Sequence, residues 1–312
     1  MNFISQQIPI KSYQILIQGG FLVSNFSSEK ETKEKNEILS PKLDVVFQIL
    51  FGEVGSEKIT KDFLSSILKE KIEEVSLNEN IVLRREYPKD KMGVVDVLAK
   101  VNGKEYCHIE IQLKEVAHLE ERLLYYWAKQ YTRSIKSGKE YESLKRTISI
   151  LITDFEVKGL ENIGMHSKWK IIEENSRKQV LTEHLEIHII EIPKMYKEEK
   201  KQNKKLIQWL NFLENPESKE VEEYMRENVN VKEAKEKLEG LSEDERVQRL
   251  AELREKAILD EKEAKYTGYM EGLEEGKKDG RREIAKKLKE EVLAIELIMK
   301  ATELKKEEIE NL

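Results

Sequence analysis

Apolar residues recur with a helical period in two segments near the start of the chain. In residues 41–52 and 56–68, apolar side chains return every three or four positions, which places them on one face of an α-helix. Ser40 followed by Pro41 predicts that the first helix begins here, because proline is favoured at the first helical position. Residues 118–137 show the same period and predict a third helix.

The pattern changes from helices to strands in the middle of the chain. Three segments alternate between apolar and polar residues and predict strands at residues 81–87, 94–101 and 106–113. Asn102-Gly103 separates the last two and is a strong hairpin signal. Residues 147–153 and 185–192 are continuous apolar runs, typical of buried central strands. Together these elements predict an α/β fold with a sheet flanked by helices.

Beyond Pro193 the sequence is helical in character almost throughout. Residues 206–213 form a strongly apolar segment, which we expect to dock on the core. Residues 228–300 are rich in Ala, Glu, Lys, Leu and Arg and contain no proline, which predicts long solvent-exposed helices. We therefore divide the chain into three parts: an N-terminal extension at residues 1–38, a core at 39–195, and a helical region at 196–312 for oligomerisation or partner binding.

Four glycines recur every four residues within that helical region, at positions 268, 272, 276 and 280. In a membrane this spacing would indicate close helix packing, but the surrounding Glu and Lys residues exclude a membrane helix. Two interpretations stay open. The glycines weaken an exposed helix by about 1 kcal/mol each, or they allow two such helices to pack closely in a homo-oligomer.

Composition and charge exclude several classes of protein. The 312 residues carry a net charge of −6, and the helical region alone has 26 basic and 31 acidic side chains. A DNA contact would therefore need a local basic patch rather than a global field. No run of 18 apolar residues exists, which excludes a membrane span. A single cysteine, Cys107, excludes a disulfide framework and fits a cytoplasmic location. No phosphate-binding or dinucleotide-binding glycine motif occurs, so we expect no nucleotide cofactor.

The candidate chemistry lies on the predicted hairpin, where each strand has one apolar face and one mixed face with an acid. A strict two-residue turn would set Asp96 opposite Ile109 and oppose a polar face to an apolar one. A three-residue loop or a bulge would set Asp96 opposite Glu110 and align both apolar faces. The sequence therefore predicts an odd-length loop or a bulge.

Two carboxylates that face each other in a half-buried site repel, and a shared proton or a divalent cation relieves the repulsion. Asp96, Glu110 and a nearby main-chain carbonyl such as that of Ile111 are hard oxygen ligands suited to Mg²⁺ or Mn²⁺. The alternative is that both acids lie on a solvated sheet face.

An ordered series of motifs adds a family resemblance. The motifs are Ser40-Pro41-Lys42-Leu43-Asp44-Val45-Val46-Phe47, Leu50-Phe51-Gly52, Val95-Asp96-Val97, His108-Ile109-Glu110-Ile111-Gln112, and Arg122 through Tyr126-Trp127. This series resembles the Rpn family of recombination-promoting nucleases, also described as PD-(D/E)XK nuclease family transposases. The resemblance implies a restriction-endonuclease-like core with a mixed sheet flanked by helices. It also implies Mg²⁺-dependent DNA cleavage linked to recombination or mobile elements.

The resemblance also implies roles for individual residues. Asp96 and Glu110 match the family's metal ligands, and Gln112 takes the position where the wider superfamily usually has lysine. Lysine brings a positive charge to the reacting phosphate, whereas glutamine can only orient water or phosphate by hydrogen bonds. Lys114, on the same face, could supply the missing charge. Asp44 matches an acid near the first helix and is either an additional metal-side acid or a capping or surface carboxylate.

The helix at 118–137 mixes cations with aromatic residues, as a DNA-backbone contact would. We expect Arg122, Gln130 and Lys114 to contact DNA, and Tyr126 and Trp127 to pack in the core. The predicted function is a divalent-metal-dependent DNA endonuclease. The alternative is a catalytically inactive relative that acts as a DNA-binding or protein-binding module.

The C-terminal residues resemble the family's short helical ending. The family usually has a Thr-Gly-Leu turn where this chain has Thr302-Glu303-Leu304. Loss of the glycine makes a left-handed turn less favourable. Because the surroundings are acidic, we expect this ending to contact protein rather than DNA.

Overall fold

The computed structural model describes residues 37–77, 82–83, 93–94, 96–135, 138–198 and 203–312. Residues 1–36 of the extension expected at 1–38, and most of the strand expected at 81–87, therefore lie outside the described residues. The main sheet has six strands in the order β1-β4-β5-β6-β8-β7. These are β1 (Val75–Leu77), β4 (Val97–Val101), β5 (Glu105–Gln112), β6 (Thr147–Thr153), β8 (Leu185–Glu191) and β7 (His166–Trp169). A second, two-stranded sheet pairs β2 (Val82–Leu83) with β3 (Gly93–Val94).

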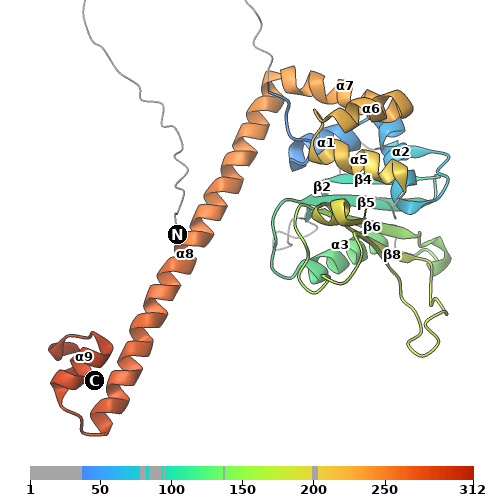
Figure 1. Ribbon diagram of the computed structural model, residues 1–312. Helices are drawn as coiled ribbons and strands as arrows, with labels where there is room; N and C mark the ends of the chain where they lie inside the picture. Colours follow the sequence, from blue (N-terminus) through green and yellow to red (C-terminus); the bar gives the residue numbers. More distant parts are fainter. Residues whose placement is uncertain (1–36, 78–81, 84–92, 95, 136–137, 199–202) are drawn as a thin grey trace, which may run out of the picture. The chain divides into compact units, whose positions relative to one another are not determined.

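The sheet is mixed, because β5, β6 and β8 run parallel while β1, β4 and β7 pair antiparallel with their neighbours. Helices cover both faces (Figure 1). One face carries α1 (Asp44–Gly52), α2 (Glu57–Leu68), α5 (Lys204–Glu214), α6 (Lys219–Glu227) and α7 (Val229–Glu243). The opposite face carries α3 (Leu119–Arg133). Short helical turns lie at η1 (Tyr141–Ser143), η2 (Ile192–Lys194) and α4 (Met195–Glu198).

The hairpin has the register that its alternating faces predict. Val97 lies opposite Ile109 and Ala99 opposite Cys107, so the two apolar faces coincide. The connection is a three-residue loop, Asn102-Gly103-Lys104, in which Asn102 and Gly103 both have positive φ. Burial of the apolar face thus selects an odd loop over the two-residue turn. The same register brings Asp96 to the level of Glu110.

The first helix begins later than the Ser40-Pro41 pair predicts, at Asp44. Residues 40–43 instead form a turn closed by a hydrogen bond from Leu43 N to Ser40 O. The turn buries Leu43 and places the Lys42 ammonium 2.7 Å from Asp154 and 2.8 Å from Glu214. These tertiary contacts outweigh the local preference for a helix start at proline.

The hydrophobic core continues past residue 195, the boundary expected from composition. As predicted, the segment 206–213 docks on the core, where it forms most of α5. The Trp209 ring lies 5.7 Å from that of Phe51 and 5.5 Å from that of Phe63. Its indole Nε1 donates to Asp62 on α2. Residue 195 therefore does not separate two cores, because α5 completes the layer that α1 and α2 begin.

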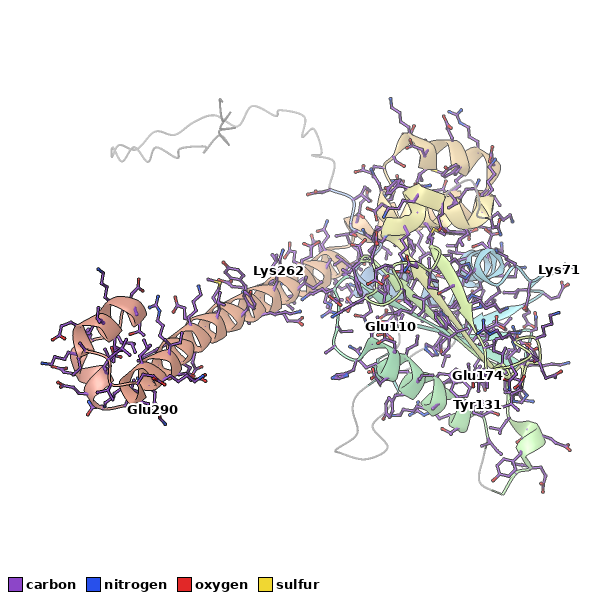
Figure 2. The ribbon with its side chains drawn as sticks, turned by 60° about the horizontal axis from the view of Figure 1, so that its bottom comes forward. Lys71, Glu110, Tyr131, Glu174, Lys262 and Glu290 are labelled. Atoms are coloured by element: carbon purple, nitrogen blue, oxygen red, sulfur yellow. The ribbon has the colours of Figure 1, made fainter. Side chains whose placement is uncertain are left out.

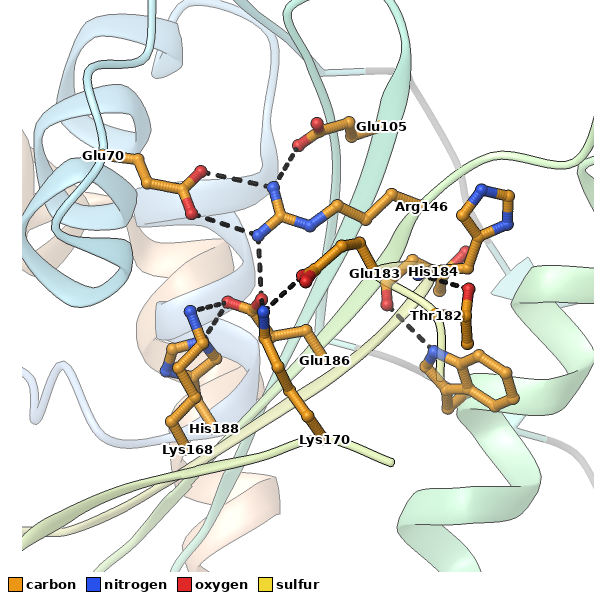
Figure 3. Close-up of polar contacts among 12 residues, drawn as sticks. Glu70, Glu105, Arg146, Lys168, Lys170, Thr182, Glu183, His184, Glu186 and His188 are labelled. Atoms are coloured by element: carbon orange, nitrogen blue, oxygen red, sulfur yellow. Dashed lines mark hydrogen bonds and ion pairs between the residues drawn. The ribbon is translucent and has the colours of Figure 1, made fainter. Parts of the chain in front are cut away.

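A buried polar cluster lies at the amino end of the parallel strands (Figure 3). The Glu186 carboxylate on β8 is fully buried and accepts from Arg146 at 2.9 Å and from Lys168 at 2.7 Å. Arg146 also binds Glu70 and Glu105, both at 3.1 Å. We call these residues, with His188, the Glu186 cluster. It joins the end of α2 to β5 and β8.

The C-terminal part consists of α8 (Glu245–Glu290), α9 (Ile295–Thr302) and α10 (Lys306–Glu310). Ala285 packs with Ile298, Leu304 and Ile309 in a small separate core. Glu303 takes the left-handed conformation at φ 55°, so the turn forms although the glycine is missing. The four glycines at 268–280 lie within α8, and a Cβ at any of them would meet nothing within 4 Å.

Candidate active site

Asp96 and Glu110 meet near the carboxyl end of β5, where parallel sheets commonly place their ligand sites. Asp96 lies just before β4, and its Oδ2 accepts a 2.7 Å hydrogen bond from the main-chain N–H of Ile111. Glu110 is 5% exposed and lies on the face of the sheet that α3 covers (Figure 2). The side chain of Asp96 thus crosses the hairpin and reaches the main chain directly beside Glu110.

Both carboxyl groups resist ionisation. Burial raises the pKa of Asp96 to about 8, and the negative charges of Glu110 and Asp44 add to the shift. The hydrogen bond from Ile111 and the charge of Arg254 oppose the shift without cancelling it. Burial also raises the pKa of Glu110, which Arg122 and Gln112 offset only in part. The two acids therefore form a site with more negative charge than its surroundings compensate.

Gln112 and Arg122 contact Glu110 directly. The Gln112 Nε2 donates to Glu110 Oε1 at 2.5 Å, and the Arg122 guanidinium lies 3.4 Å from the same oxygen. Arg122 comes from the first turns of α3, is 39% exposed, and places its guanidinium over the Tyr126 ring. Gln112 therefore holds the Glu110 carboxylate by a neutral hydrogen bond and adds no charge.

A cavity of about 470 Å³ opens at this site, and part of its wall comes from α8. The lining includes Asp44, Asp96, Glu110, Lys114 and Arg122 from the core, together with Arg254, Ile258 and Glu261 from α8. No motif in the sequence indicated the three α8 residues. They are more than 140 positions from the hairpin, and only the packing of α8 against α1 brings them here.

The cations in the cavity are engaged with acids. Arg254 pairs with Asp44, at 2.6 Å between the Arg254 Nη2 and Asp44 Oδ2. Lys114 Nζ donates to the main-chain oxygen of Ile258 at 3.0 Å and to Glu261 at 2.8 Å. Lys114 therefore points toward α8 rather than toward Gln112. Its contacts connect the end of β5 to α8.

Asp44 has features of both expected roles, the metal-side acid and the capping or surface carboxylate. Its Oδ1 accepts from Val45 N at the start of α1, and it forms the ion pair with Arg254. It also lines the cavity and contributes to the raised pKa of Asp96. Asp44 is thus a carboxylate at the edge of the site that also holds Arg254 in place.

One residue expected to contact DNA, Gln130, has other surroundings. Gln130 is 6% exposed on the side of α3 that packs on the sheet, so we leave it out of the DNA-contacting set. Tyr126 is largely buried, and Trp127 packs in the core and donates to Thr147 O, as predicted for both residues. His108 is buried beside Ser149, and its burial lowers the imidazole pKa to about 4. It is therefore neutral at pH 7.

The sequence profile of PD-(D/E)XK nuclease family transposases matches residues 41–268. The chain belongs to this family. Its function is thus related to nucleases and transposases, and its mixed sheet flanked by helices is consistent with the PD-(D/E)XK fold. The match spans Asp44, Asp96, Glu110 and Gln112 and extends into α8 past Arg254. Comparisons with curated proteins and with solved structures gave no match.

Among the described residues, none of the helices combines the length and the hydropathy needed to cross a membrane. The same residues contain no group of three or more His, Cys, Asp or Glu side chains placed to hold a metal ion. Mg²⁺ usually takes only one or two carboxylates and keeps several waters. The Asp96–Glu110 pair therefore fits such a cation by its donor chemistry and by its uncompensated charge.

Proposed function

We propose that this chain is a divalent-metal-dependent DNA endonuclease that acts in recombination or in the movement of mobile elements. The observation that carries the proposal is the pairing of Asp96 and Glu110 in one cavity, where burial raises the pKa of both carboxyl groups and the charge of Glu110 raises the pKa of Asp96 further. Strongly perturbed acids in a cavity are typical of functional sites. The family match supplies the reaction class.

Asp96, Glu110 and the main-chain carbonyl of Ile111 would hold Mg²⁺ or Mn²⁺. The cation would stabilise charge on the reacting phosphate and lower the pKa of water. Gln112 keeps the Glu110 carboxylate oriented through its hydrogen bond. Arg122 is half-exposed at the rim and would contact a phosphate of the DNA backbone.

Arg254 and Lys114 would supply the positive charge that Gln112 lacks. Both line the cavity, and each is bound to a carboxylate, Arg254 to Asp44 and Lys114 to Glu261. A DNA phosphate carries a full negative charge and competes with such partners for the cations. In this arrangement the catalytic cations come from two elements, the end of β5 and α8.

The same ion pairs favour a second candidate function. If DNA does not displace Asp44 and Glu261, the cations stay paired and the protein acts as an inactive DNA-binding or protein-binding module. One experiment separates the two functions.

The test is nicking of supercoiled plasmid by the purified protein with Mg²⁺, with Mn²⁺ and with EDTA. We expect metal-dependent nicking that Asp96→Ala and Glu110→Ala each reduce by at least about 100-fold, the usual effect of removing a group that stabilises transition-state charge. Glu174→Gln, which changes an exposed carboxylate between β7 and β8, is the matched control and should keep full activity. Equal inactivity of the wild type and both alanine variants, with circular dichroism unchanged, would favour the binding module.

A further inference from the structure

The helix α3 forms one wall of the catalytic cavity and exposes an aromatic side chain that the proposed reaction does not use. Arg122 and Tyr126 of this helix line the cavity. Between them in the sequence, Tyr125 is 44% exposed and Leu124 is 49% exposed. The surface that α3 offers to a ligand beside the cavity is therefore partly apolar and includes a tyrosine ring.

The same helix carries the local positive charge that a DNA contact requires in this acidic chain. Residues 122–139 contain five basic and no acidic side chains, whereas the whole chain has a net charge of −6. At about 100° per residue, Arg122, Lys129 and Arg133 fall within an arc of about 40° on one side of α3. The helix begins beside Glu110 and leads away from it toward Tyr131 (Figure 2), so the positive charge extends outward from the cavity. A DNA backbone that leaves the cavity in this direction is attracted along its path.

Cations and aromatic rings alternate on this part of α3 and hold one another in place. The Arg122 guanidinium lies 5.9 Å from the centre of the Tyr126 ring, and the Lys129 ammonium lies 5.8 Å from that of Tyr125. The two tyrosine rings are 5.5 Å apart and tilted by 65°. Because these contacts already fix the Tyr125 ring, little conformational freedom is lost when a ligand stacks on it.

An exposed ring beside a row of cations is typical of a surface that binds an unpaired strand. In a duplex the faces of the bases stack on one another, and the outer surface offers phosphates, sugars and base edges. Proteins that bind single strands combine positive charge along the backbone with aromatic side chains on which the free bases stack. Tyr125 and the cations of α3 supply both parts.

The size of the cavity agrees with a single strand. A cube of 470 Å³ has an edge of about 8 Å, less than the width of about 12 Å that the major groove of a duplex has by itself. The cavity lies between α3 on one side and Arg254, Ile258 and Glu261 of α8 on the other. One strand can reach Asp96 and Glu110 between these walls, whereas a whole duplex would stay outside.

We propose that the substrate of this site is DNA with an unpaired strand, which passes from the Asp96–Glu110 cavity along α3 with one base stacked on Tyr125. The inference rests on the proposed endonuclease function and narrows its substrate. Arg122 at the rim would bind the phosphate nearest the cavity. Tyr125 lies three residues, or about 4.5 Å along the helix axis, beyond Arg122 and would take a neighbouring base.

The first test measures binding in EDTA, where no cleavage occurs, by fluorescence anisotropy of a labelled oligonucleotide as a single strand and as a duplex of the same sequence. We expect the wild type to bind the single strand at least about tenfold more tightly than the duplex. Tyr125→Ala should weaken single-strand binding about tenfold, in the range of base–aromatic stacking, and leave duplex binding unchanged. Tyr125→Phe keeps the ring and should bind the single strand as the wild type does.

Tyr269→Ala is the matched control for the binding test. Tyr269 is 66% exposed on α8 and does not line the cavity, so its removal should leave both affinities unchanged. Equal binding of single strand and duplex by the wild type would overturn the proposal. So would an equal loss of both affinities in Tyr125→Ala, because it would show that the tyrosine contacts the backbone and not a base.

The second test compares cleavage, with Mg²⁺, of a perfect duplex and of the same duplex with a short unpaired bubble. We expect faster cleavage of the bubble substrate, and Tyr125→Ala should remove this preference. Equally fast cleavage of both substrates by the wild type and by Tyr125→Ala would refute the unpaired-strand substrate and leave the endonuclease function standing. Single-strand binding that depends on Tyr125, without cleavage of either substrate, would refute the endonuclease function and support the strand contact on α3.

Discussion

Two buried carboxylate sites on one sheet differ in how their charge is compensated. Glu186 lies at the amino end of β8 on the face that α2 and α5 cover, and Arg146, Lys168 and His188 all donate to it. Glu110 lies near the carboxyl end of β5 on the opposite face, and its side-chain partners among the described residues are Arg122 at 3.4 Å and a neutral glutamine. Cationic side chains of the protein compensate the charge of Glu186, whereas the charge of the Asp96–Glu110 site is compensated only in part.

The pKa of the carboxyl groups shifts in opposite directions at the two sites. Burial opposes the charge of Glu186, but the hydrogen bonds from His188, Lys168 and Arg146 outweigh it and hold the pKa well below its ordinary value. Burial dominates at Asp96 and Glu110, and both pKa values are raised. A satisfied carboxylate stabilises the fold, while an unsatisfied pair destabilises it and is retained where a ligand supplies the missing charge.

The largest expected effect on stability comes from breaking the Glu186 cluster. Glu186→Gln leaves Arg146 and Lys168 without their buried anion and should lower the free energy of unfolding at pH 7 by about 3 kcal/mol. Because the pKa of Glu186 is lowered in the folded state, its contribution is complete above the ordinary carboxyl pKa and disappears only in strong acid. Urea unfolding followed by circular dichroism measures the change.

Glu183→Gln is the matched control for this prediction. Glu183 pairs with Lys170, which lies 3.8 Å from Glu186, but the Glu183 side chain is 62% exposed. Exposed ion pairs contribute little, so the control should change the free energy of unfolding by less than about 0.5 kcal/mol. Equal effects of the two substitutions would show that burial does not distinguish these carboxylates.

The next effect concerns the pH dependence of cation binding at the Asp96 site. With a pKa of about 8, the Asp96 carboxyl keeps its proton in the folded protein at neutral pH, so a cation must displace that proton. The affinity for Mn²⁺ should therefore fall about tenfold for each pH unit below 8. Isothermal titration calorimetry at pH 6, 7 and 8 measures the slope. An affinity that stays constant over this range would refute the raised pKa of Asp96.

The smallest effect is a gain in stability on neutralising the same site. The folded pKa of Asp96 lies above its ordinary value of 3.8, so the metal-free protein loses stability as the pH rises from about 4 to about 8. Asp96→Asn can keep the hydrogen bond from Ile111 and removes this loss. Because Asp96 is only partly shielded from solvent, we expect a gain of about 1 kcal/mol at pH 8. Near pH 4 the gain should vanish.

Urea unfolding in EDTA at both pH values checks this prediction. A loss of stability at pH 8 would mean that Asp96 is as well compensated as Glu186, and the contrast between the two sites would not hold.

Several parts of the site could be predicted from local sequence alone. The alternation of the hairpin strands determined their register, because a slip by one residue would turn every apolar side chain of one strand toward the polar face. The predicted register sets Asp96 beside Glu110 without any information on tertiary contacts. The buried runs at 147–153 and 185–192 likewise identified β6 and β8, since such apolar segments must be covered on both faces.

Only the tertiary structure decided which distant groups complete each site. Arg254 and Glu261 enter the cavity from α8, and Arg146 reaches Glu186 from the start of β6. Gln130 has the spacing of an exposed contact but lies buried on the side of α3 that packs on the sheet. The short strands β1 and β7 were also not predicted. Period and motif describe neighbours along the chain, whereas an ion pair between residues 44 and 254 depends on packing that a single sequence does not display.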